Sequence, residues 1–176
     1  MDAIVKALDC DSNSTTVQEQ LSKALSLLGG KFSYTGEALV ETWLLEKAEM
    51  VWDKTTRLDD EESKMESWIQ KAATVLLSSG KRRFLAGLSN AIANGIPCLA
   101  HSCLVTVAWI SSSLVSFKNA DIGLMATSVL TPCLLENLNS DKDEHEMLLS
   151  SLALANLARN SERIRGQVML LEQRKE

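Results

Sequence analysis

Proline and glycine are scarce in this sequence of 176 residues, which contains only 2 prolines and 8 glycines. A β-sandwich or β-barrel needs such residues at its frequent turns, and no stretch alternates apolar and polar residues with the period of a strand. The apolar content of 45% and the charged content of 23% are typical of a globular protein. We therefore predict a single all-α domain that covers residues 1–176.

An excess of basic residues is also missing, because 18 Lys and Arg stand against 23 Asp and Glu and give a net charge of -5. Affinity for a phosphate backbone depends on clustered positive charge, so we expect no nucleic-acid partner. Residues 81–83, which read KRR, could form an anion site or an import signal. A solvated helix start is the preferred interpretation of so short a run.

Cysteine and histidine are too few for a RING module, which needs eight such ligands for two zinc ions. Four cysteines and two histidines give six. Cys98, His101 and Cys103 lie close in sequence, but the first and last of them point about 140° apart on a helix and cannot share a metal. We predict no catalytic residue, no cofactor, no metal and no small-molecule substrate. The cysteines are scattered without a CxxC pair and no cleavable signal peptide is recognised, so we expect reduced thiols inside the cell, in the cytoplasm or nucleus.

Charged residues are absent from residues 84–117. Within this stretch, residues 96–117 have about the length that spans a bilayer. Asn90, Asn94, Pro97, His101 and several serines are many polar groups for a lone membrane span. We prefer a helix that is buried on all sides of a helical protein, and membrane association through residues 96–117 is the alternative.

Apolar residues recur with the helical period in a series of segments. A short first helix precedes one that Thr15 or Thr16 caps and that Gly29 and Gly30 end. Later boundaries are predicted at Gly80, at Pro97, at Thr131 and Pro132, and at Ser161. The predicted helical units are residues 1–30, 37–79, 83–116 and 119–158, followed by a C-terminal helix over residues 161–176.

Three segments share one order, in which a short apolar helix, a polar break and a longer helix follow each other. They are residues 1–30, 83–112 and 130–160. Self-similarity of this kind is typical of an α-solenoid of stacked helical pairs, each of which buries one face on the next. The alternative is a bundle without repeats, since leucine-rich helices resemble each other by chance.

The segments TPCLLENL and SSLALANLARN are similar to the second and third helices of an armadillo repeat. The stretch SWIQKAATVLLSSGKRRFLAGLSNAIANGIPCLAHSCLVTVAWISSSL resembles the armadillo-like region of plant LIN-type E3 ubiquitin ligases, the Cerberus family. In that family a U-box precedes this region and WD40 repeats follow it. The resemblance implies an armadillo-like scaffold that binds a protein partner or ubiquitination substrate. The chain has no U-box pattern of its own, so we expect it to be no enzyme by itself.

The resemblance also implies two candidate partner contacts. Asn156 matches the asparagine with which armadillo importers hold an extended peptide. The corresponding positions in the other repeats are Trp109 and Leu27, so no ladder of asparagines is present. Trp109 is a candidate contact as well, with burial in the core as the preferred alternative.

Overall fold

The computed structural model describes residues 2–8, 13–28, 39–49, 60–114, 117, 120–139 and 143–173, and it contains no strand in these residues. The helices are α1 (Asp2–Ala7), α2 (Thr15–Leu28), α3 (Leu39–Glu49), α4 (Asp60–Asn94), α5 (Pro97–Ser113), α6 (Ala120–Glu136) and α7 (Glu144–Gln173). The all-α prediction is confirmed. The predicted stops at Gly29 and Gly30 lie outside the described residues.

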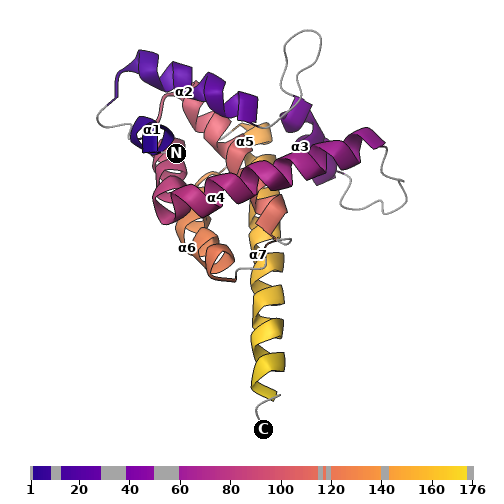
Figure 1. Ribbon diagram of the computed structural model, residues 1–176. Coiled ribbons are helices and arrows are strands. Elements are labelled where there is room, and N and C mark those ends of the chain that lie inside the picture. The colour runs from indigo at the N-terminus through magenta and orange to yellow at the C-terminus, as the bar shows by residue number, and fades with distance from the viewer. Residues whose placement is uncertain are drawn as a thin grey trace.

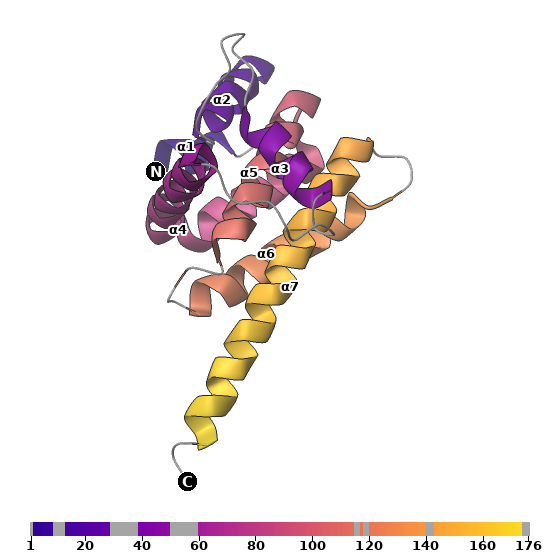
Figure 2. The ribbon, with the colours of Figure 1, turned by 90° about the vertical axis from the view of Figure 1, so that its right-hand side faces the viewer.

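Six of these helices form three pairs, in which α1 contacts α2, α4 contacts α5 and α6 contacts α7. The first helices of the pairs contact one another in the order α1, α4, α6, and the second helices in the order α2, α5, α7. Two layers of stacked helices result, which is the predicted armadillo-like solenoid. The remaining helix, α3, contacts α5 and α7, and the last turns of α7 project beyond the other helices (Figures 1 and 2).

A bend at Lys81 divides α4 into residues 60–80 and 82–94, because Lys81 has φ 44° and ψ -137°. This left-handed conformation is costly for a residue with a side chain. The break predicted after Gly80 is therefore present, although the two parts stay joined. The second part packs against α1 at Gly87, where a Cβ would lie 2.9 Å from the Cβ of Leu8.

The centre of the stack is α5, which contacts α2, α3, α4 and α7. It begins at Pro97, whose missing N–H costs nothing in the first turn of a helix. Residues 102–111 are all buried. The uncharged stretch of the sequence is thus explained, because a helix enclosed by others has no polar face, and the buried-helix prediction is confirmed. None of the helices traced in the described ranges combines the length and the apolar character that crossing a membrane requires.

Two predicted helix boundaries are wrong. The helix α6 continues through Pro132 to Glu136, so no separate short helix begins there. The helix α7 has no break at Ser161, whose Oγ donates back to the Leu157 carbonyl at 3.0 Å instead of capping a new helix. In α6, which packs against α4 and α7, packing within the stack outweighs the local tendency to break.

Candidate interaction surfaces

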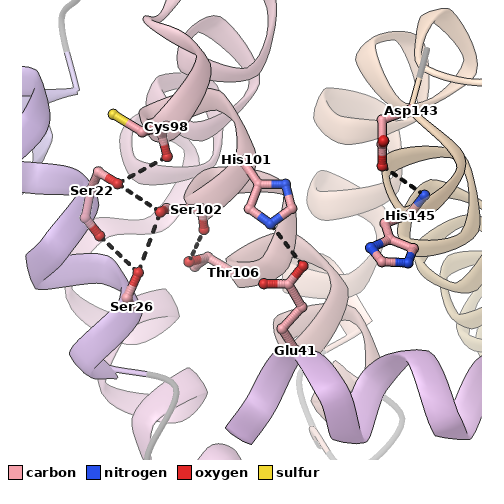
Figure 3. Close-up of polar contacts among 9 residues, drawn as sticks. All are labelled: Ser22, Ser26, Glu41, Cys98, His101, Ser102, Thr106, Asp143 and His145. Carbon is pink, nitrogen blue, oxygen red and sulfur yellow. Dashed lines mark hydrogen bonds and ion pairs between the residues drawn. The ribbon is translucent and has the colours of Figure 1, made fainter. Parts of the chain in front are cut away.

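Serine side chains join the second helices of the first two pairs. The Oγ of Ser22 on α2 lies 2.9 Å from the carbonyl of Cys98 and 2.8 Å from the Oγ of Ser102 on α5 (Figure 3). The Oγ of Ser26 lies 3.3 Å from the same Ser102 hydroxyl. Ser22 and Ser102 are buried, so these hydrogen bonds are shielded from water and fix the position of α2 along α5.

The two candidate contact residues lie inside the stack. Asn156 on α7 is 7% exposed, and its Nδ2 donates to the Oγ of Ser111 on α5 at 3.4 Å. Trp109 on α5 is completely buried, and its Nε1 has no hydrogen-bond partner in the described part of the chain. Both side chains thus take part in packing within the stack. A contact with a partner at either position stays a prediction.

A pair of side chains that the sequence did not reveal anchors α3 on α5. The Nε2 of His101 lies 2.8 Å from the Oε1 of Glu41 (Figure 3). This hydrogen bond is the main reason that the pKa of His101 is raised above 6.5 and the pKa of Glu41 is lowered below 4.5, while burial opposes both changes. The charges of Glu146 on α7 and of Asp143, which directly precedes α7, raise the pKa of His101 further. Because 60 positions separate the two partners, no local pattern could have predicted the pair.

The Glu41 and His101 pair stabilises the docking of α3 within a limited pH range. The contribution of Glu41 is present above pH 4.5 and is lost as the pH falls through its lowered folded pKa. The contribution of His101 is fully present below pH 6.5 and is lost as the pH rises through its raised folded pKa. The pair is therefore strongest between pH 4.5 and 6.5. Both side chains are partly exposed, so the gain stays below about 1 kcal/mol.

Large apolar side chains remain on the surface at several places. Trp68 on α4 is 53% exposed, and its Nε1 donates to the carbonyl of Leu28 at the end of α2 at 3.3 Å. Val75, two turns further along α4, and Leu27 on α2 are also exposed. Ile69, the residue after Trp68 on α4, is buried in the core. Two further exposed side chains, Leu124 and Leu135, lie on α6, and Leu138 lies just after its end.

A shallow groove of about 370 Å³ separates the second part of α4 from α6. These are the first helices of two neighbouring pairs. Small side chains line it, together with the polar groups of Asn90, Asn94 and Glu136. Cys133 also lines the groove, but burial raises the pKa of its thiol and keeps it from acting as a thiolate. The described lining of the groove therefore holds no activated thiol nucleophile.

Over residues 1–176, the chain matches the family model described as "Putative E3 ubiquitin-protein ligase LIN, ARM-like domain". The chain belongs to this family. It is 25% identical to "Putative E3 ubiquitin-protein ligase LIN-1" of Lotus japonicus and 26% identical to "Putative E3 ubiquitin-protein ligase LIN" of Medicago truncatula. Each comparison covers 88% of this chain but 11% of the relative, so the chain spans about a tenth of their length. No solved structure matches the chain.

The cysteines of this LIN ARM-like domain lie in separate environments. Cys98 is exposed, Cys103 is buried, and His101 between them is bonded to Glu41. Among the residues that can be placed, no three His, Cys, Asp or Glu side chains form a cluster that could hold a metal ion. The described surface of the ARM-like domain includes the exposed Trp68 and the groove beside α6.

Proposed function

We propose that this ARM-like domain is a protein-interaction scaffold of a LIN-type ubiquitin ligase and presents a protein partner or a ubiquitination substrate. The observation that carries the proposal is the half-exposed indole of Trp68, held in place by its hydrogen bond to the Leu28 carbonyl. Tryptophan is enriched among the few residues that supply most of the binding energy of an interface. An exposed tryptophan bonded to the end of α2, where Leu27 is also exposed, is typical of a partner contact.

Preorganisation supports the same function. A side chain whose orientation is already fixed loses less conformational entropy when a partner binds. The helix that carries Trp68 is fixed as well, because its neighbours Ile69 and Ala73 are buried in the core. An intracellular site of action, in the cytoplasm or nucleus, is part of the proposal, and the three cysteines that the structure describes are all free thiols.

The test uses LIN-1 of Lotus japonicus. The region that matches this chain is deleted, or it is replaced by this chain in its wild-type, Trp68→Ala or Leu124→Ala form. Proximity labelling records the captured proteins, and ubiquitin transfer onto them is measured. Leu124 is the matched control, because it is 48% exposed on a different helix.

We expect the deletion and the Trp68→Ala form to lose a shared set of captured proteins, and the wild-type and Leu124→Ala forms to restore it. Loss of ubiquitin transfer onto the same proteins would make them substrates rather than other partners. If the deletion changes neither the captured proteins nor the transfer, the scaffold function is refuted.

A further inference from the structure

We propose that the groove between α4 and α6 binds an extended peptide segment that carries a lysine or arginine side chain. This inference rests on the scaffold function proposed above, since it names a surface and the chemistry of a partner. The groove lies at the junction of two helical pairs, between residues 86–94 of α4 and residues 129–136 of α6. The Lys81 bend separates it from Trp68 on the same helix.

The shape of the groove favours an extended chain. Ala86 and Ala93 lie on its α4 side, and side chains as small as these let another backbone approach a helix closely. The volume of 370 Å³ accommodates a few residues of a peptide. A bound helix would be about 10–12 Å wide and needs a larger depression.

An amide pair on α4 supplies hydrogen bonds for a peptide backbone. The Nδ2 of Asn94 donates to the Oδ1 of Asn90 at 2.8 Å. This bond leaves the Nδ2 of Asn90 as a donor and the Oδ1 of Asn94 as an acceptor. Side chains four positions apart on a helix lie about 5–6 Å from each other. Two residues of an extended chain span about 6.6 Å, so the pair can meet a backbone C=O and N–H on one side of the peptide.

The α6 side of the groove offers a carboxylate. Glu136, one turn beyond Pro132, is exposed and lines the groove. Neither Lys nor Arg is found among the lining residues, so the Glu136 charge is unbalanced within the groove. A basic side chain on the peptide is its complement.

A phage-displayed library of random linear heptapeptides, selected on the intact chain, tests the proposal. We expect the selected sequences to carry Lys or Arg at one fixed position. The best sequence is then synthesised with a fluorescent label, and its binding is measured by anisotropy. Asn90→Ala with Asn94→Ala should weaken binding about tenfold for any selected peptide. Glu136→Gln should weaken the basic peptide but not its Lys→Met version.

Two further variants serve as controls, and circular dichroism confirms that each variant is folded. Glu144→Gln removes an exposed carboxylate on α7 outside the groove and should leave binding unchanged. Selected peptides without a basic residue, or equal binding to the Asn90 and Asn94 double variant, would overturn the proposal. The scaffold function can fail independently: the groove would then bind peptide, while deletion of the domain from LIN-1 would change no captured protein. If the Trp68→Ala variant still binds the peptide, the groove and the Trp68 contact are two distinct binding surfaces.

Discussion

Replacement of Trp109 by alanine distinguishes a core residue from a partner contact. Trp109 is the largest of the completely buried side chains. Truncation of a buried tryptophan to alanine removes its transfer free energy and leaves a cavity, at a total cost of about 3–5 kcal/mol. For a chain of this size each kcal/mol lowers the melting temperature by about 2–4 °C, so we expect a decrease of about 6–20 °C.

The Trp109→Phe variant separates the packing of the ring from its unpaired nitrogen. The Nε1 has no partner in the described residues, and a buried donor without a partner costs about 1–3 kcal/mol. Phenylalanine removes this donor and leaves a void of some tens of Å³, which costs on the order of 1 kcal/mol. The two effects nearly cancel, so we expect the free energy of unfolding to stay within about 1 kcal/mol of the wild type.

Urea unfolding followed by far-ultraviolet circular dichroism is the assay, because changing a tryptophan alters the fluorescence signal itself. The slope of the unfolding free energy against urea concentration should be the same for each variant as for the wild type, because an equal slope means that unfolding exposes the same amount of surface. Trp68→Ala is the matched control, since this half-exposed tryptophan should change stability by about 0.5 kcal/mol or less. If Trp109→Ala is as harmless as Trp68→Ala, the core assignment of Trp109 is refuted.

Three other predictions concern contacts between helices. Gly87→Ala should destabilise the chain by about 1–3 kcal/mol, because the added Cβ clashes with Leu8, and amide exchange in α1 should become faster. A gain in stability of about 1 kcal/mol, as helix propensity alone would give, would contradict the close packing. Ser22→Ala should cost about 0.5–1.5 kcal/mol in urea unfolding, and a neutral result would mean that the buried serine contact adds nothing to stability. The free energy of unfolding of the wild type should exceed that of Glu41→Gln at low pH, and the difference should shrink as the pH rises above 6.5 through the raised pKa of His101. A constant difference up to pH 9 would refute the role of the pair.

The sequence predicted those parts of the fold that depend on local signals. Pro97 begins α5, as expected of a residue that lacks an N–H, and the uncharged run that follows is the buried helix. A local signal of the same kind lies at Asp143, whose Oδ1 caps α7 by accepting a hydrogen bond from the backbone N–H of His145 at 2.9 Å. Each of these signals acts within a few residues, so a sequence pattern can report it.

The remaining features depend on contacts between segments that lie far apart in sequence. Pro132 reads as a helix breaker, yet α6 continues past it because the helix packs against α4 and α7. The Glu41 and His101 pair forms because α3 is placed on α5. The groove arises where the second part of α4 meets α6, so its lining residues come from two helices that no local pattern connects.

The two proposed contacts, Trp68 and the groove, lie on opposite sides of the bend in α4. The positive φ of Lys81 is unfavourable for a residue with a side chain, so the bend persists because packing on both sides requires it. Ile69 and Leu77 are buried before the bend, and Phe84 and Leu88 are buried after it. Changing the angle between the two parts would pull one of these sets out of the core. Trp68 and the groove are thus held at a fixed orientation, and a partner that contacts both would bind without reorganising the stack.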